Sequence, residues 1–305
     1  MSPAPLWDPE VLARIAHLHI QARGLVQGLH QGAHRSVRSA ANVEFTDYKE
    51  YSPGDPLRDI DWRVLARTDR LVVRRHRAEE ELGCLILLDA SADLATGRGS
   101  RYPLLPGPYQ GTKWSWALVL AASLALAALR RGEPVGLAII GGDSVRWRFL
   151  PLATGDAHLS RILGTLASIR PAGRADLAEG LLQLGPRLRK GVMTVLVSDL
   201  MEEPSAWGPT LASLRGTAMD LRIVHVHDTA EWSFSVGGPA RYRSPEGGPA
   251  LPVDPLDVRP RMAAAVAEYL AEVRSWAAQA GALHLLAASD TDLALVLARL
   301  LRGRN

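Results

Sequence analysis

Short apolar runs of strand length alternate with helical segments along most of this chain, and this alternation constrains the fold more than any other feature. "LGCLILLD" at 82–89 is a continuous apolar run, typical of a parallel strand that is buried on both faces. Similar runs occur at 134–140, 192–199, 219–228 and 282–288. Helices are expected between and after them, at about 113–131, 156–169, 176–190, 204–216 and 259–280, and from Asp290. The pattern predicts an α/β domain with a doubly wound, mostly parallel sheet.

Three segments depart from this rhythm. "GGD" at 141–143 is a turn signal, so 144–150 is expected to form a hairpin with the strand before it. The Gly- and Pro-rich segment 229–258 is expected to be a β-hairpin insertion. Residues 9–31 favour a helix that packs against the rest of the protein through a stripe of small residues, Gly24, Gly28 and Gly32. We therefore divide the chain into an N-terminal region, 1–80, and an α/β domain, 81–305.

Composition excludes several classes of protein. Hydrophobic residues make up 47% and charged residues 22%, which is a globular balance, and Cys84 is the only cysteine, so an intrachain disulfide or a Cys-based zinc site is impossible. A net charge of +3 names no partner, and the basic run 70–77 is followed at once by three glutamates, so nucleic-acid binding is not expected. No secretory signal is visible, and the apolar run 114–129 is shorter than a membrane span. We expect a cytoplasmic protein without a membrane span of its own.

The stretch "YSPGDPLRDIDWR" at 51–63 holds three aspartates, two arginines and a tryptophan just before the first clear strand. Its "SPGD" is a turn signature, and Asp55 followed by Pro56 suits the N-cap and first residue of a helix. Local physical chemistry alone predicts a short capped helix whose charges neutralise one another. Arg58, Asp61 and Trp62 fall at the edges of its apolar stripe, so we expect them to form one partly buried cluster against the α/β domain.

The same stretch carries a family resemblance. Residues 43–81, running into "LILLDASAD", resemble the signature of the family catalogued as domain of unknown function 58. The residues that match as they stand are Glu44, Phe45, Tyr51, Gly54, Asp55, Arg58, Ile60, Asp61, Trp62, Ala66, Arg67, Leu71 and Val73. "GAHRS" at 32–36 and the insertion near 231–256 are similar to the regions that flank the signature, so the resemblance covers nearly the whole chain.

This resemblance implies a fold and a partner. The fold is a von Willebrand factor A-like domain preceded by the charged signature region. The partner is an AAA+ ATPase of the MoxR class, with which members of the family are frequently associated. The signature at 51–63 is then interpreted as a brace on the α/β domain or as a surface for that partner.

A metal site is also implied by the resemblance. Von Willebrand A domains hold a divalent ion at the carboxyl ends of the strands, with D-x-S-x-S in the first loop, Thr in a second and Asp in a third. This chain offers Asp89, Ser91 and Asp93 in the first loop and Asp199 in the third. Strands that end at Asp89 and Asp199 are expected to lie side by side. That arrangement would bring Asp89, Ser91, Asp93 and Asp199 together at one edge, and oxygen ligands of this kind are those that Mg²⁺ prefers.

Two positions depart from the family pattern. Asp93 stands where the second serine is expected, and Ala175 stands where the threonine is expected, with Arg174 beside it. A guanidinium matches carboxylate geometry, so Arg174 could lie across the aspartates in place of the ion. The sequence therefore leaves two states open: a bound Mg²⁺, or a degenerate site that needs no metal. His225 and His227, two apart on one strand, could also bind a metal, but such histidines are more often hydrogen-bonded under a helix.

The functional expectation is a non-enzymatic protein-interaction module. By resemblance it acts with a MoxR-type AAA+ ATPase on a client protein, in remodelling, assembly or metal loading. The alternative is a Mg²⁺-dependent hydrolase or phosphoryl-transfer enzyme that uses Asp89, Asp93 and Asp199. The chain contains no G-x-S-x-G elbow, Walker A loop or H-E-x-x-H motif, and no catalytic residue is assigned.

Overall fold

The structure is a computed structural model. It describes residues 13, 16–17, 19–27, 47–52, 62–75, 83–100, 102, 109–143, 146–189, 191–216, 220–233 and 238–301.

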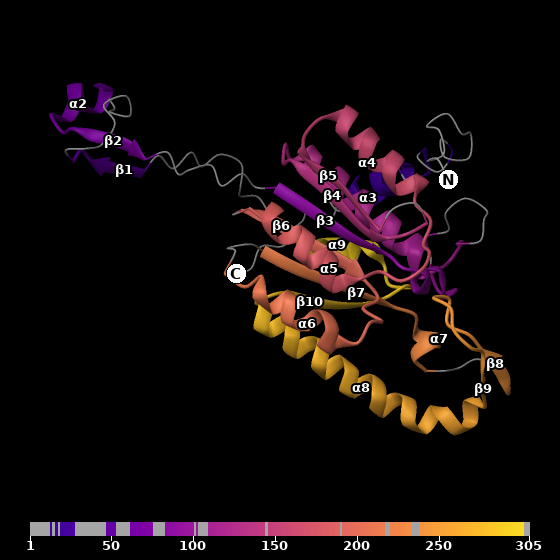
Figure 1. Ribbon diagram of the computed structural model, residues 1–305. Coiled ribbons are helices and arrows are strands. Elements are labelled where there is room, and N and C mark those ends of the chain that lie inside the picture. The colour runs from indigo at the N-terminus through magenta and orange to yellow at the C-terminus, as the bar shows by residue number, and fades with distance from the viewer. Residues whose placement is uncertain are drawn as a thin grey trace.

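A single large sheet forms the centre of the α/β domain (Figure 1). Among the described residues it has six strands in the order β10-β7-β6-β3-β4-β5. The strands are β3 (Gly83–Ala90), β4 (Val135–Gly141), β5 (Trp147–Ala153), β6 (Val192–Ser198), β7 (Asp220–His227) and β10 (Leu283–Ala288). Neighbouring strands are parallel except β4 and β5, which form the hairpin predicted at "GGD". The doubly wound, mostly parallel sheet predicted from the sequence is therefore confirmed.

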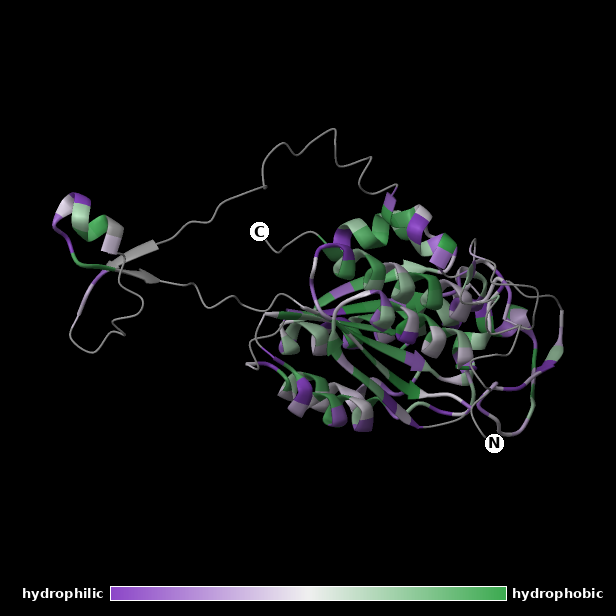
Figure 2. Ribbon diagram, turned by 90° about the horizontal axis from the view of Figure 1, so that it is seen from above, coloured by the Kyte–Doolittle hydropathy of each residue, from purple (hydrophilic) through white to green (hydrophobic). Residues whose placement is uncertain are grey.

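Helices cover both faces of this sheet (Figure 1). On one face lie α3 (Lys113–Arg130), α4 (Asp156–Ser168) and α9 (Leu293–Leu301). On the other lie α5 (Leu177–Leu184), α6 (Pro204–Ser213) and α8 (Pro255–Ala280). Side chains of β3 alternate between the two cores, with Ile86 and Leu88 facing one and Leu85 and Leu87 facing the other. This burial on both faces explains why the strand sequences are continuously apolar, as the hydropathy colouring of Figure 2 shows.

Helix α3 is the central helix of the fold. Every residue from Lys113 to Ala128 is buried, which explains why this run lacks a polar face. By length and composition α3 is the one helix in the described part of the chain that could cross a membrane, and 89% of it lies inside the protein. The prediction of a buried helix here is confirmed. The helix predicted near the N-terminus packs on the same side, through Ala22 and Val26.

The predicted stripe of small residues on that N-terminal helix is wrong at Gly24. A methyl group at Gly24 would meet no atom within 4 Å, so no backbone approaches it closely. The buried contacts come instead from Ala22 and Val26, which are 1% and 0% exposed. Within the described part of this helix, Ala22 and Val26 therefore define the packed face; Gly28 and Gly32 lie outside the described residues.

The N-terminal signature region folds into a small antiparallel unit. Strand β1 (Asp47–Glu50) pairs with β2 (Val72–Arg75), and helix α2 (Trp62–Thr68) lies between them in sequence. The side chain of Trp62 is 61% exposed, so the expectation that it is partly buried against the α/β domain is wrong. The physical reason is that a two-stranded hairpin and a seven-residue helix offer too little apolar surface to cover an indole. The signature residues that lie outside the described residues are Glu44, Phe45, Gly54, Asp55, Arg58, Ile60 and Asp61.

The segment after β7 forms the insertion predicted from its glycines and prolines. It contains α7 (Thr229–Trp232) and the antiparallel pair β8 (Ala240–Tyr242) and β9 (Leu251–Val253). The hairpin is confirmed, but helix α8 begins at Pro255, four residues earlier than expected. Asp254 caps α8 by accepting a hydrogen bond from the backbone N–H of Leu256 at 2.9 Å, and Pro255 occupies the first helical position.

The close packing of α6 against α8 gives a test of the fold. A Cβ atom at Gly208 would lie 2.4 Å from Cδ2 of the Trp276 ring. We expect Gly208→Ala to lower the free energy of unfolding by about 1–3 kcal/mol, because the indole must move out of a packed layer. Gly24→Ala is the matched control, with an expected change between zero and a gain of about 1 kcal/mol. Urea denaturation measures both; a Gly208→Ala protein as stable as the wild type would contradict this account of the α6–α8 interface.

Candidate functional site

The carboxyl ends of β3 and β6 lie side by side, as the sequence predicts. The two strands are parallel neighbours, with Leu88 opposite Val197. Asp89 and Asp199, near the ends of these strands, are each 2% exposed. Two carboxylates from residues far apart in the sequence are therefore buried at one edge of the sheet.

Asp89 is held by two donors from this edge. The hydroxyl of Ser198 donates to its Oδ2 at 2.6 Å, and the backbone N–H of Ser91 donates to its Oδ1 at 2.8 Å. Burial, followed by repulsion from Asp199, raises the pKa of the Asp89 carboxyl to about 7. Near neutral pH the carboxyl of Asp89 is therefore present in both its protonated and its ionised form.

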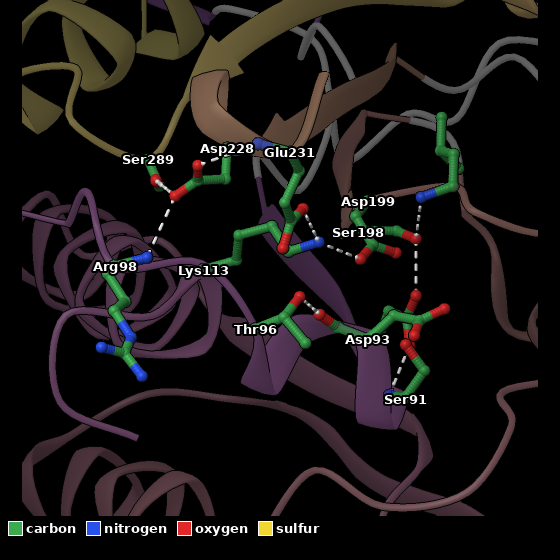
Figure 3. Close-up of polar contacts among 12 residues, drawn as sticks. Ser91, Asp93, Thr96, Arg98, Lys113, Ser198, Asp199, Asp228, Glu231 and Ser289 are labelled. Atoms are coloured by element: carbon green, nitrogen blue, oxygen red, sulfur yellow. Dashed lines mark hydrogen bonds and ion pairs between the residues drawn. The ribbon is translucent and has the colours of Figure 1, made fainter. Parts of the chain in front are cut away.

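Lys113 supplies the positive charge at the edge. Its Nζ lies 2.9 Å from Oδ2 of Asp199 and 2.8 Å from Oε2 of Glu231, and its side chain is only 2% exposed (Figure 3). Burial works to lower the pKa of this amine, but Asp199 and Glu231 outweigh that effect and raise it. Lys113 therefore stays charged between two carboxylates. From the sequence, no role was assigned to Lys113, and this one was missed.

The backbone around Lys113 fixes where its ammonium group lies. Thr112 caps α3 by accepting a hydrogen bond from the N–H of Ser115. The N–H of Lys113 donates to the carbonyl of Thr96 at 3.1 Å, which ties the first turn of α3 to the loop after β3. Glu231 comes from α7, at the start of the insertion. The ammonium group thus joins α3, the end of β6 and the insertion.

Asp93 lies on the same loop as Asp89 but in a more open position. It belongs to the short 3-10 helix Ala92–Ala95 that follows β3. Partial burial, then repulsion from Asp199 and Glu246, raises the pKa of its carboxyl to about 6. The structure therefore brings Asp89, Ser91, Asp93 and Asp199 to one edge, as expected, and adds Ser198, Lys113 and Glu231.

Arg174 does not lie across the aspartates, so that sequence interpretation is wrong. Its loop does reach the edge, because the N–H of Ala92 donates to the carbonyl of Gly173 at 2.9 Å. Its guanidinium, however, is 81% exposed and donates to Glu246 of the insertion at 2.8 Å. The Lys113 ammonium already pairs with Asp199, and Glu246 pairs with the guanidinium. Ala175, at the place of the family's threonine, is buried against Gly141.

Asp228 organises the neighbouring loops. It caps α7 by accepting from the N–H of Ala230 at 2.8 Å, and it also accepts from the N–H groups of Arg98 and Gly99 (Figure 3). The approach is so close that a Cβ atom at Gly97, which has a φ of +82°, would lie 2.6 Å from the Asp228 carboxylate. No role was assigned to Asp228 from the sequence. In the structure it connects the loop after β3 to the insertion.

The two histidines of β7 are packed among rings. His225 is fully buried, and its Nδ1 lies 3.3 Å from Nε2 of His284 on β10. Burial, then the neighbouring histidines, lowers the pKa of His225 to about 3. His227 stacks on Trp232 with ring centroids 3.9 Å apart. His225 also packs edge-on against Tyr269 of α8, so it lies under that helix as expected, whereas His227 packs on α7.

A divalent ion does not fit this arrangement. The ammonium group of Lys113 already contacts Asp199, one of the carboxylates that would have to bind the ion. Within the described ranges, no three His, Cys, Asp or Glu side chains are placed so that they could hold a metal ion. The polar groups at this edge are paired with one another: Lys113 with Asp199 and Glu231, and Asp89 with Ser198.

Comparison with known proteins identifies the family. The chain matches the family model described as "Protein of unknown function DUF58" over residues 47–272, well over half its length. The chain belongs to this family. Its curated relatives include the uncharacterized proteins Rv1480 of Mycobacterium tuberculosis and Mb1516 of Mycobacterium bovis. Each is 26% identical over 303 residues, which covers 98% of this chain and 91% of the relative.

Solved structures similar to this DUF58 protein include two α/β proteins. BatB from Bacteroides thetaiotaomicron aligns with a TM-score of 0.45 and 11% identity, over 72% of this chain and 97% of its own. The SpRpn10 VWA domain aligns with a TM-score of 0.42 and 12% identity, over 71% and 93%. The fold is identified by the order and direction of its own strands.

Titration of Asp89 gives a test of the site. Because its folded-state pKa of about 7 lies above its ordinary value of 3.8, the folded protein binds the extra proton and loses stability as pH rises through that window. Asp89→Asn mimics the neutral carboxyl at every pH. Between about pH 5 and pH 8 we expect the wild type to lose at least about 1 kcal/mol more than this variant.

Urea denaturation across this pH range measures the difference. Asp257→Asn, on the exposed first turn of α8, is the matched control and should follow the wild type. Parallel pH profiles for Asp89→Asn and the wild type would contradict the assignment of a raised pKa to Asp89.

Proposed function

We propose that this DUF58 protein is a non-enzymatic protein-interaction module built on a von Willebrand factor A-type domain. The observation that carries the proposal is the internal pairing of the polar groups at the carboxyl edge. Lys113 pairs with Asp199 and Glu231, and Asp89 accepts from Ser198 and from the N–H of Ser91. Lys113 is held by two carboxylates and Asp89 by two donors, so neither is free to act as the nucleophile or base that a reactive centre needs.

The proposed partner is a MoxR-type AAA+ ATPase, and the proposed role is the remodelling, assembly or metal loading of a client protein. The partner and the role both come from the family resemblance. They are consistent with a cytoplasmic location, which stays a prediction. The signature region offers a contact surface for such a partner, because Trp62 is 61% exposed. Exposed tryptophans are enriched among the residues that dominate binding energy at protein interfaces.

The alternative, a Mg²⁺-dependent hydrolase or phosphoryl-transfer enzyme, is disfavoured by the same contacts. Such an enzyme needs Asp89, Asp93 and Asp199 as charged ligands around the ion. In the structure the ammonium group of Lys113 contacts Asp199 and so occupies the place beside that carboxylate.

Affinity capture from the native host tests the proposal. The tagged protein is expected to retain an AAA+ ATPase of the MoxR class, identified by mass spectrometry after mild cross-linking. Steady turnover of a phosphorylated substrate by the isolated protein in the presence of Mg²⁺ would overturn the proposal in favour of the enzyme.

Trp62 gives a sharper version of this test. We expect Trp62→Ala to change the free energy of unfolding by less than about 1 kcal/mol, because the indole is mostly in water, yet to weaken capture of the ATPase at least tenfold. Leu182→Ala, which removes another apolar side chain that is 59% exposed, is the matched control and should leave capture unchanged. Equal capture by the two variants would argue against the signature region as the contact surface.

A further inference from the structure

Lys113 is placed where a lysine is ordinarily unfavourable. It is the first residue of α3, close to the positive end of the helix dipole, and its side chain is only 2% exposed. A buried ammonium group is stable only when carboxylates pair with it and accept its hydrogen bonds. Asp199 at 2.9 Å and Glu231 at 2.8 Å meet that requirement.

The carboxylates at this edge are in turn stabilised by a nearby positive charge. Asp89 and Asp199 are almost fully buried, Asp93 is partly buried, and Glu231 approaches from α7. Four carboxyl groups close together repel one another unless a cation lies among them or some of them hold a proton. Lys113 is the side chain whose ammonium group contacts two of them directly.

We propose that the ammonium group of Lys113 is the permanent counterion of the carboxyl edge and makes this site independent of divalent metal ions. The edge then keeps its shape whether or not Mg²⁺ or Mn²⁺ is present. This inference goes beyond the proposed function, because it concerns the charge balance of the edge and holds whichever partner the protein binds.

The same ammonium group has a second structural consequence. Through Glu231 it fastens the first helix of the insertion, α7, to the edge of the sheet. Asp228, the N-cap of α7, accepts hydrogen bonds from the N–H groups of Arg98 and Gly99. These bonds hold the start of α7 to the loop after β3. Lys113 therefore sets the position at which the insertion leaves the sheet.

A double-mutant cycle tests the proposal. Lys113→Met removes the charge but keeps much of the length of the side chain, and Asp199→Asn removes the charge of its buried partner. We expect Lys113→Met to lower the melting temperature by more than about 5 °C, and Lys113→Met combined with Asp199→Asn to recover at least half of that loss. Glu231, which is 33% exposed, can be solvated by water and needs no replacement.

Arg130→Met, at the exposed far end of α3, is the matched control and should leave the melting temperature unchanged within about 2 °C. Millimolar Mn²⁺ or Mg²⁺ should not raise the melting temperature of the wild type. A clear rise, or calorimetric binding of Mn²⁺ by the wild type, would overturn the proposal. A Lys113→Met protein that melts like the Arg130→Met control, or a double variant that recovers nothing, would also overturn it.

Discussion

The buried ammonium group of Lys113, held between Asp199 and Glu231, is the contact on which the carboxyl edge of this protein depends. Removing one partner of a buried ion pair costs about 3–5 kcal/mol, whereas an exposed pair contributes about 1 kcal/mol or less. The pair of Arg174 with Glu246 belongs to the second kind, because its guanidinium is 81% exposed. The pairs of Lys113 with Glu231 and of Arg174 with Glu246 both reach the insertion, but the ammonium group of Lys113 is buried and the guanidinium of Arg174 is exposed.

The fold provides the site before any partner is present. Parallel pairing of β3 with β6 brings Asp89 and Asp199 to one edge, and the N-terminus of α3 delivers Lys113 to the same place. Donors from adjacent residues then orient the carboxylates, as Ser198 does for Asp89. The polar groups of this edge are therefore paired with one another inside the protein. Such pairing suits a structural part of a binding domain more than a centre that must exchange protons or ligands during a reaction.

Much of the fold was predictable because its signals are local. Continuous apolar runs indicated strands buried on both faces, and "GGD" indicated the β4–β5 hairpin, since each pattern reflects the environment of its own segment. The meeting of Asp89 with Asp199 was also predictable, because parallel neighbours end at the same edge. Trp62 was not, because the extent of its burial depends on how much apolar surface the small signature unit can offer.

The identity of the cation was the part that sequence could not supply. Lys113 meets Asp199 and Glu231 across 86 and 118 residues of chain, and no local pattern connects them. The resemblance to the family placed Arg174 beside the position of a metal ligand, so Arg174 was the expected cation. In the structure its guanidinium pairs with Glu246 of the insertion instead. One signal was present: Lys113 is one of only three lysines, with Lys49 and Lys190, in a chain otherwise supplied with arginine. A lysine at the start of a largely apolar helix indicated that its ammonium group could be buried.

That scarcity of lysine makes the central claim directly measurable. In protein labelled with ¹⁵N-lysine, the ammonium group of a buried, ion-paired lysine exchanges its protons slowly with water, whereas exposed lysines exchange too fast to be seen at neutral pH. We predict a persistent ammonium signal at neutral pH that is absent from Lys113→Arg and unmoved by Mg²⁺. The absence of any protected signal from the wild type, or a signal that shifts or vanishes as Mg²⁺ is added, would contradict the assignment of Lys113 as the counterion of this edge.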